Sequence, residues 1–195
     1  YHINILLENK SAFPCFCSAN RLNEVREIQT KNKLPIQYDG KCRSISFKSA
    51  IKKMSQLPYT IRLKIPKDIN ISFDDKIHGN ILIHSQELDD QILIKSDGFP
   101  TYHFANVIDD HNMQISHVIR GEEWLPSLPK HIHLYNCFEW EVPDFAHLPL
   151  LLNKDKTKLS KRQGDVAVED YINKGYLKEA LINFVALLGW HESND

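Results

Sequence analysis

The chain has 195 residues, of which 42% are hydrophobic and 25% are charged, and its 24 Lys and Arg against 25 Asp and Glu leave a formal net charge of -1. These values are ordinary for a folded globular protein and exclude disordered and fibrous classes, and any basic surface must be local. No apolar run reaches the roughly 20 residues that a membrane helix needs, and the start of the chain lacks a signal-peptide pattern. We therefore expect a cytoplasmic or organelle-matrix protein with no membrane partner.

The first half of the chain predicts a helix followed by hairpins. Ser18 is a cap-type residue that precedes apolar residues spaced three apart, which predicts an amphipathic helix ending before Pro35. Alternating apolar and polar residues predict a strand at "YTIRLKI", and "GNILIHS" and "QILIKSDGFPTYH" are predicted as further strands, with a tight-turn signal at Asp97-Gly98. Residues 45–100 are therefore expected to form an α+β insertion of hairpins.

From Thr101 onward, strands and helices alternate. A helix capped by Thr101, a buried strand at "ISHVIRG", a helix capped by Ser127 and a strand at "DFAHLPLLL" follow in that order. This order predicts half of a parallel α/β unit, whose ligands bind at the carboxyl ends of the strands. The segment "VAVEDYINKGYLKEALINFVALLGW" is expected to be helical, with one apolar stripe and natural stops at Gly175 and Gly189.

A basic run, "KTKLSKRQGD", begins at Lys156 and places four cations in seven positions before a glycine. By composition alone such a run is a solvated surface loop, because exposed charges contribute little to stability. A loop directly after a core strand can also bring lysines onto a triphosphate and stabilise the charge of departing pyrophosphate. Composition leaves both interpretations open.

A second group of residues is suited to binding a carboxylate. Tyr102 and Asn106 are four residues apart on a predicted helix, so a phenol and an amide share one face. Arg120, at a strand end, offers a planar fork that matches a carboxylate. The alternative is a core tyrosine and a surface arginine, which the spacing does not exclude.

Two histidine-containing runs are not expected to bind metal. Asp109, Asp110 and His111 are consecutive on a predicted helix and point in different directions. His131 and His133 have the spacing of a strand inside a helical segment, so their rings would not converge and surface positions are expected.

Three ordered blocks of the sequence resemble one family. "KLSKR" resembles the KMSKS-type signature of class I aminoacyl-tRNA synthetases, and its setting, "HLPLLLNKDKTKLSKRQGDVAVEDYINKGYLKEALINFVALLGW", is similar to bacterial-type glutamyl-tRNA synthetases. "SDGFPTYHFANVIDDHNMQISHVIRGEEWLPSLPKHIHLY" is similar to the second Rossmann half of that family, and "CFC" with "YDGKCR" extends the resemblance to the start of the chain. The resemblance implies an α/β fold: the second half of a class I Rossmann catalytic domain, an α+β acceptor-binding insertion and a following helical stem-contact segment.

The resemblance implies an ATP-dependent ligase that, with Mg²⁺, activates L-glutamate to glutamyl-adenylate and transfers it to the 3′ end of tRNA(Glu). The implied catalytic residues are Lys161 and Lys158. The implied ATP contacts are Lys158, Leu159, Ser160, Lys161, Arg162, Glu123, Trp124 and Leu151. Tyr102, Asn106 and Arg120 would surround the glutamate, and Arg120 favours glutamate because glutaminyl-tRNA synthetases do not usually carry an arginine there.

The cysteines near the start of the chain resemble the C-x-C…Y-x-x-x-C zinc site of some family members. The implied ligands of one structural Zn²⁺ are Cys15, Cys17, Tyr38 and Cys42. Zinc prefers four tetrahedral N, S or O ligands, although tyrosine is uncommon among them, and the His of some members is Ser44 here. The alternative is a set of reduced thiols near a turn. The distant Cys137 is expected to be a buried, small apolar residue.

The resemblance also implies a division of the chain. The expected segments are the end of the first Rossmann half (1–14), a zinc-binding segment (15–44), the acceptor-binding insertion (45–100), the second Rossmann half (101–155), the KLSKR loop (156–165) and the start of the helical stem-contact domain (166–195). The HIGH-type motif and an anticodon-binding domain do not occur in the sequence. We therefore expect an internal fragment of a monomeric enzyme, inactive by itself.

Two alternatives stay open. Glutamyl-queuosine tRNA(Asp) synthetase shares the catalytic half but tends to have a shorter segment before the tyrosine, whereas 20 residues separate Cys17 from Tyr38 here. A non-catalytic tRNA-binding or zinc-binding module derived from the same fold is the other alternative. In that module, residues 45–100 would contact RNA phosphates.

Overall fold

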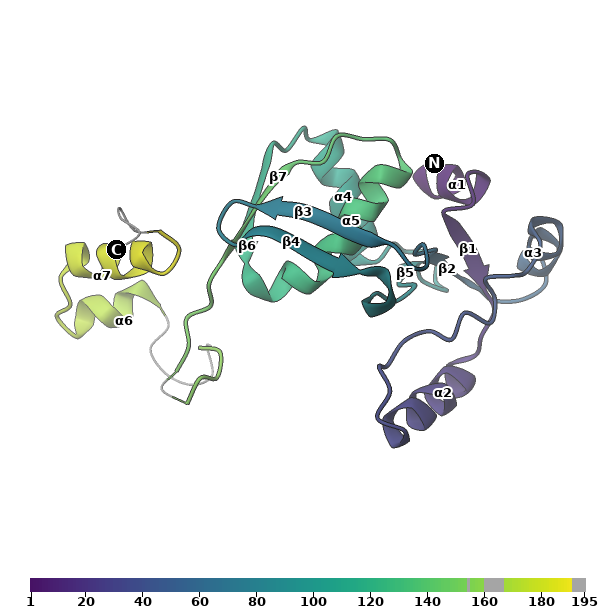
Figure 1. The fold of residues 1–195 in the computed structure, drawn as a ribbon, viewed down its shortest axis with the longest axis horizontal. Coiled ribbons are helices and arrows are strands. Elements are labelled where there is room, and N and C mark those ends of the chain that lie inside the picture. The colour runs from purple at the N-terminus through teal and green to yellow at the C-terminus, as the bar shows by residue number, and fades with distance from the viewer. Residues whose placement is uncertain (154, 160–166, 191–195) are drawn as a thin grey trace. The chain divides into compact units, whose positions relative to one another are not determined.

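The computed structural model describes residues 1–153, 155–159 and 167–190, and Figure 1 shows its helices and strands. The chain divides into two compact units. Unit 1 consists of Tyr1–Phe73, Leu82–Ile115 and Ser127–Val142, and unit 2 of Asp74–Ile81, Ser116–Pro126 and Pro143–Asp195.

Unit 1 is built on a three-stranded antiparallel sheet with strand order β1-β2-β5. The strands are β1 (Ala12–Cys15), β2 (Thr60–Leu63) and β5 (Ile92–Ile94). Leu63 and Leu93 are fully buried. Both are apolar residues of the predicted strands, whose successive side chains alternate between the two faces of the sheet. The strand β1 ends at Cys15, so the sheet fixes the position of the first predicted metal ligand.

Five α-helices and a 3₁₀ turn complete unit 1. They are α1 (His2–Glu8), α2 (Ala19–Lys31), α3 (Phe47–Met54), η1 (Ser85–Glu87), α4 (Tyr102–Asn112) and α5 (Leu128–Cys137). The predicted Ser18 cap is confirmed, because its Oγ accepts a hydrogen bond from the backbone N of Arg21 at 3.3 Å. Helix α4 begins after Thr101 as predicted, but the Thr101 hydroxyl donates to the carbonyl of Ile92 at 2.8 Å and does not cap the helix.

The helix α5 corrects the expectation of two surface histidines. His131 is only 1% exposed, and its Nε2 lies 2.9 Å from His103 Nδ1. His133 is partly buried, and its Nε2 lies 3.1 Å from the carbonyl oxygen of Lys64. The expectation was wrong because α5 is buried around most of its circumference, which helical spacing alone does not reveal.

Unit 2 contains the predicted parallel strand pair, β6 (His117–Gly121) and β7 (Asp144–Leu148). The hairpin of β3 (Asn70–Asp75) and β4 (Gly79–His84) reaches this unit with its tip, where Asp75 pairs with Phe145, and the strand order is β4-β3-β7-β6. The strand β6 was expected to be buried, but Ile119 is 66% exposed. The burial pattern of β6 alternates between exposed and half-buried residues at His117, Val118, Ile119 and Arg120, so one face of the strand is open.

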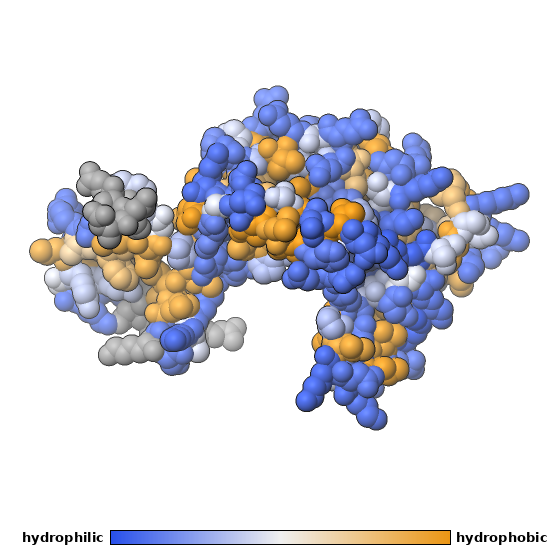
Figure 2. All heavy atoms as spheres, viewed as in Figure 1, coloured by the Kyte–Doolittle hydropathy of each residue, from blue (hydrophilic) through white to orange (hydrophobic). Residues whose placement is uncertain are grey.

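The predicted C-terminal helical segment forms two helices, α6 (Val168–Asn173) and α7 (Lys178–Leu187). Gly175 separates them with a φ of +80°, a conformation that favours glycine. Apolar side chains of this pair, including Ile172, Leu177 and Ile182, are exposed. Figure 2 shows a hydrophobic area over this part of the chain. Among the described residues, no helix is both long and apolar enough to cross a membrane.

Candidate functional site

Three thiols and one phenol meet in unit 1 just beyond the end of β1. The Sγ atoms of Cys15, Cys17 and Cys42 all lie within 4.8 Å of one another, and those of Cys17 and Cys42 are 3.7 Å apart. The Tyr38 hydroxyl lies 3.5 Å from Cys15 Sγ and 3.6 Å from Cys17 Sγ. In a tetrahedral zinc site with Zn–S bonds of about 2.3 Å, neighbouring sulfur atoms are roughly 3.8 Å apart. The donor atoms therefore lie at distances that fit one tetrahedral ion.

The backbone around these residues explains why they converge. Cys17 directly precedes the cap of α2, and the turn at Gly40, with a φ of +75°, returns the chain to Cys42. The Tyr38 hydroxyl accepts a hydrogen bond from the backbone N of Cys42 at 2.8 Å. The backbone N of Tyr38 donates to Asp89 Oδ1 at 2.7 Å, which ties this loop to the segment before β5.

Two arginines surround the thiol cluster. Arg21 Nη1 donates to Cys17 Sγ at 3.3 Å, and the same guanidinium forms an ion pair with Asp39. Arg62 is only 4% exposed, and its Nη1 donates to the carbonyl of Asp90 at 2.8 Å. Both cations favour negative charge on the sulfur and oxygen atoms beside them.

The pKa values of the cluster reflect its crowding. Burial raises the pKa of Cys17 to about 11, and the neighbouring Cys15 adds to this rise. Burial by itself would raise the pKa of Cys15, but hydrogen bonding to Tyr38 and the Arg62 guanidinium hold it below its usual value. Burial also raises the pKa of Tyr38. Adjacent acidic groups cannot all ionise unless a cation lies beside them, so the chemistry of the cluster suits a metal ion.

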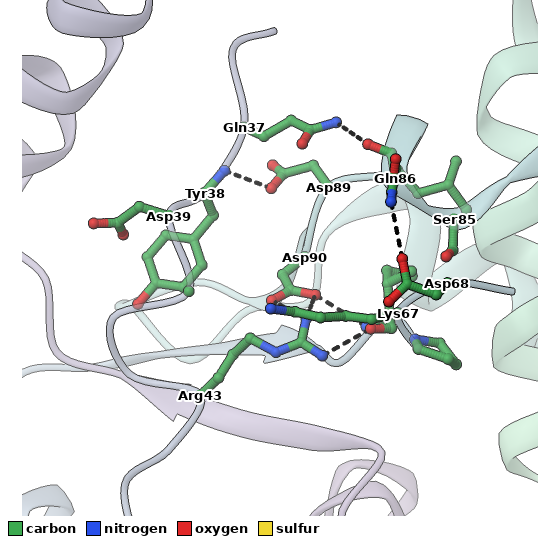
Figure 3. Close-up of a pocket in the computed structure, with 14 residues that line it drawn as sticks. Gln37, Tyr38, Asp39, Arg43, Lys67, Asp68, Ser85, Gln86, Asp89 and Asp90 are labelled. Carbon is green, nitrogen blue, oxygen red and sulfur yellow. Dashed lines mark hydrogen bonds and ion pairs between the residues drawn. The ribbon is translucent and has the colours of Figure 1, made fainter. Parts of the chain in front are cut away.

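A pocket of about 510 Å³ adjoins the loop that carries Tyr38 (Figure 3). Arg43 Nη1 bonds both carboxylate oxygens of Asp90 at 2.7 and 2.8 Å, and its Nη2 donates to the carbonyl of Ile65. Burial raises the pKa of Asp90, although Arg43 and the backbone N of Ile65 oppose this rise. The lining contains Asp39, Asp68, Asp89 and Asp90 against the cations Arg43 and Lys67. This excess of carboxylates is unsuited to a triphosphate.

In unit 2, Arg120 of β6 contacts a buried aspartate–histidine pair. Its Nε donates to His147 Nε2 at 3.0 Å, and His147 Nδ1 lies 2.6 Å from Asp75 Oδ2. Asp75 Oδ1 also accepts hydrogen bonds from the backbone N of Ile77 and of His78, each at 3.0 Å. The Asp75 and His147 side chains are both fully buried. Sequence reasoning missed this pair.

The hydrogen bonds define the protonation of the pair. His147 Nε2 accepts a hydrogen from Arg120, so Nδ1 carries the ring proton and donates it to Asp75. Burial lowers the pKa of His147, and the Arg120 charge adds to this, while Asp75 opposes it. Burial alone would raise the pKa of Asp75, but hydrogen bonds from His147 and three backbone N–H groups hold it below its usual value. The pair therefore consists of a carboxylate and a neutral imidazole.

A sequence signal for the pair exists. In β3, Ile71, Phe73 and Asp75 occupy the buried phase of the strand, and in β7 Phe145 and His147 do the same. Polar residues in the buried phase of a strand need a partner inside the protein.

Several predicted ATP contacts lie in unit 2. Lys158 Nζ is 2.5 Å from Glu123 Oε1, and the hydrogen bond from Lys158 lowers the pKa of Glu123. The Arg120 guanidinium carbon lies 5.8 Å from the ring centroid of Trp124. The carbonyl of Leu151 accepts a hydrogen bond from the backbone N of Leu159 at 2.9 Å. The structure thus pairs Glu123 with Lys158, and Leu151 with Leu159.

The remaining predicted residues are placed separately. Tyr102 is exposed and Asn106 half-buried on α4, and both belong to unit 1. Because Arg120 belongs to unit 2, the grouping of these three residues in one glutamate pocket stays a prediction. Ser160, Lys161 and Arg162 lie outside the described residues.

Known proteins resemble the chain over its whole length. It is 56% identical over 194 residues to the glutamate–tRNA ligase of Chlorobium phaeobacteroides strain DSM 266, covering 96% of this chain and 39% of that protein. It is 52% identical over 190 residues to the glutamate–tRNA ligase of Clostridioides difficile strain 630, covering 97% of this chain and 38% of that protein. The crystal structure of glutamate-tRNA synthetase from Elizabethkingia anophelis matches the fold with a TM-score of 0.81 at 38% identity, covering 99% of this chain and 44% of that one.

The chain thus spans about two fifths of the length of these relatives. Residues 1–195 match the family described as tRNA synthetases class I (E and Q), catalytic domain. The predicted α/β fold of a class I synthetase catalytic domain is confirmed by this match and by the structural likeness. The chain therefore belongs to the family of class I tRNA synthetases of the E and Q type, as part of their catalytic domain.

Proposed function

We propose that the protein carrying this chain is a glutamate–tRNA ligase. It activates L-glutamate with ATP and Mg²⁺ to glutamyl-adenylate and transfers the glutamyl group to the 3′ end of tRNA(Glu). The observation that carries the proposal is the match along nearly the whole chain to glutamate–tRNA ligases at 51% to 56% identity. Because the chain spans about two fifths of those proteins, the reaction is proposed for the whole protein.

Arg120 is proposed to recognise the side-chain carboxylate of glutamate. A guanidinium presents N–H groups in a planar fork that matches two carboxylate oxygens, and it stays charged at all relevant pH values. Its attachment to a buried Asp75–His147 pair supports this role, because a fixed arginine loses less freedom on binding. Tyr102 and Asn106 are proposed to complete the pocket.

The nucleotide site is proposed to use the basic loop and the residues after β6. The carboxylate of glutamate attacks the α-phosphorus of ATP, and pyrophosphate leaves. The terminal ribose hydroxyl of the tRNA then attacks the acyl carbon, and AMP leaves. Such chemistry depends on positioning and on cations that stabilise the phosphate charge. Proposed ATP contacts are Glu123, Trp124, Leu151, Lys158, Leu159, Ser160, Lys161 and Arg162, with Lys161 and Lys158 as the catalytic cations.

The thiol cluster is proposed to hold one structural Zn²⁺. The residues that would bind it are Cys15, Cys17, Tyr38 and Cys42, whose donor distances fit a tetrahedral ion. The ion would supply folding free energy to the loop and take no part in the transfer reaction. We further propose that residues 15–44 form a zinc-binding segment, 45–100 contact the tRNA acceptor end, and 166–195 begin a stem-contact domain.

The test uses the purified full-length protein. We expect glutamate-dependent ATP–pyrophosphate exchange in the presence of tRNA(Glu), and charging of tRNA(Glu) with radiolabelled glutamate. Lys161→Ala is expected to slow adenylate formation more than it weakens glutamate binding. Transfer of glutamate to tRNA(Asp) in place of tRNA(Glu) would establish the queuosine-modifying alternative. Binding of tRNA without any exchange would establish a non-catalytic module.

A further inference from the structure

We propose that Asp75 and His147 are positioning residues that hold Arg120 in the orientation that receives the substrate carboxylate. This inference rests on the proposed role of Arg120 in glutamate recognition. Its physical basis is the chain of two hydrogen bonds from Asp75 Oδ2 through the imidazole to Arg120 Nε, at 2.6 and 3.0 Å.

The carboxylate of Asp75 fixes which nitrogen of His147 is the acceptor. A carboxylate only accepts hydrogen bonds, so it selects the tautomer with the proton on Nδ1. Nε2 then has a lone pair, which accepts the Nε–H of Arg120. In the other tautomer two N–H donors would face each other, and Arg120 would lose this contact. Asp75 therefore acts on Arg120 through the histidine.

The contact at Nε restricts how Arg120 can bind a carboxylate. A guanidinium can present either its two terminal nitrogens or the edge formed by Nε and one terminal nitrogen. Because the Nε–H of Arg120 already donates to His147, a carboxylate cannot bind at the edge formed by Nε and one terminal nitrogen. Binding through the two terminal nitrogens is therefore favoured. The ring of Phe145 also lies against the guanidinium, with its centroid 5.6 Å from the Arg120 central carbon. These contacts hold a long side chain in one orientation, which lowers the entropic cost of binding.

The backbone fixes Asp75 itself. Its Oδ1 accepts hydrogen bonds from the backbone N of Ile77 and of His78 in the hairpin turn. The Asp75 carboxylate also accepts a hydrogen bond from the backbone N of His147. The hairpin tip and β7 are therefore joined at one fully buried carboxylate. The register of β3 against β7, which pairs Asp75 with Phe145, places this carboxylate beside the histidine two residues further along.

Asp75→Asn is the sharpest test of the tautomer argument. The amide oxygen would keep the Oδ1 position, because two turn N–H groups donate there. The amide nitrogen would then face His147 Nδ1 and force the ring proton onto Nε2, against Arg120. In the full-length enzyme we expect the KM for glutamate in pyrophosphate exchange to rise about tenfold or more, because a charge-assisted hydrogen bond is lost. The KM for ATP is expected to stay unchanged.

Two histidine variants and one control complete the test. His147→Gln keeps an acceptor oxygen for Arg120, whereas His147→Leu does not. The His147→Gln enzyme is therefore expected to have a lower KM for glutamate than the His147→Leu enzyme. The control is Asp74→Asn in the same strand, where the exposed side chain bonds Asn80 and not the histidine. Circular dichroism and thermal unfolding report the folded fraction of each variant.

The outcomes separate the inference from the proposed function. A wild-type protein without glutamate-dependent exchange would overturn the proposed function and the inference with it. With an active wild type, an equal KM for glutamate in the glutamine and leucine variants would overturn the inference alone. So would a fall in kcat at unchanged KM, which indicates a merely structural role. If Asp75→Asn does not fold, the two histidine variants decide the question.

Discussion

The guanidinium of Arg62 lies over the ring of Tyr38, with its central carbon 4.2 Å from the ring centroid. Arg62 is buried, and within the described ranges no carboxylate forms an ion pair with it. A buried cation is costly unless it faces negative charge. Three thiolates and a phenolate around one Zn²⁺ would carry net negative charge, so the proposed metal centre is a suitable partner for this arginine.

We therefore expect Arg62→Met to weaken zinc binding about tenfold, as loss of an outer contact to a metal site typically does. Arg62→Lys keeps the charge but not the planar contact with Tyr38, so its zinc affinity should lie between that of Arg62→Met and that of wild type. The measurement is competition with a chromophoric chelator. Arg26→Met is the matched control, because Arg26 is exposed on α2 and bonds Asn23. Equal zinc affinities of Arg62→Met and Arg26→Met would show that Arg62 does not support the metal centre.

The thiol cluster itself predicts a metal-dependent stability. Cys42→Ser should reduce bound zinc to background and lower the Tm, because an ion that binds only the folded state stabilises it. A chelator should lower the Tm of the wild type but not of this variant. Cys137→Ser is the control, since Cys137 lies outside the cluster. Metal content by mass spectrometry and unfolding scans give the two readouts, and a Cys42 variant that keeps one equivalent of zinc would refute the ligand set.

The Arg43–Asp90 pair predicts a strong asymmetry between buried and exposed ion pairs. Arg43→Met leaves the Asp90 carboxylate, only 5% exposed, without its cation, and we expect a loss of about 3 kcal/mol in the free energy of unfolding. Lys95→Met removes the exposed partner of Asp97 and should leave the free energy of unfolding nearly unchanged, because solvent screens an exposed pair. Denaturant unfolding at pH 7 provides the comparison.

The pH dependence of the Arg43 variant gives a second check. A carboxyl whose pKa is raised in the folded state costs stability above that pKa, and the cost vanishes as the pH falls below the unfolded value. Burial already raises the pKa of Asp90, and loss of Arg43 should raise it further. The deficit of Arg43→Met relative to wild type should therefore shrink on acidification. A deficit that grows at low pH would show that Asp90 is not its source.

Local patterns were sufficient to predict much of the fold. The Ser18 cap, the helix of α2 and the parallel pair β6 and β7 depend on spacing within short segments, and each is confirmed. The thiol cluster could be predicted because its residue types are rare and lie within one short stretch. The burial of His131 could not, because it depends on how α5 packs within unit 1.

The Asp75–His147 pair shows where sequence reasoning stops. The two residues are 72 positions apart, and only the register of β3 against β7 brings them together. Each occupies the buried phase of its strand, a signal that marks a polar residue in need of a partner without naming it. The partner follows from tertiary structure alone.

The protonation of this pair predicts a loss of stability in acid. Burial and Arg120 lower the pKa of His147, so its neutral form is favoured in the folded state and stability is lost as the pH falls below the unfolded histidine value of about 6.5. Asp75, whose pKa is also lowered, contributes stability above the unfolded aspartate value of about 3.9 that is lost on further acidification.

His147→Gln should remove the loss of stability that comes from His147, so its Tm should fall less than that of wild type between pH 7.5 and 5. His117→Gln, at an exposed position on β6, is the control for replacing a histidine in this part of the chain. Parallel profiles for His147→Gln and wild type would mean that the pKa of His147 is the same in the folded and unfolded states, which would contradict the lowered pKa.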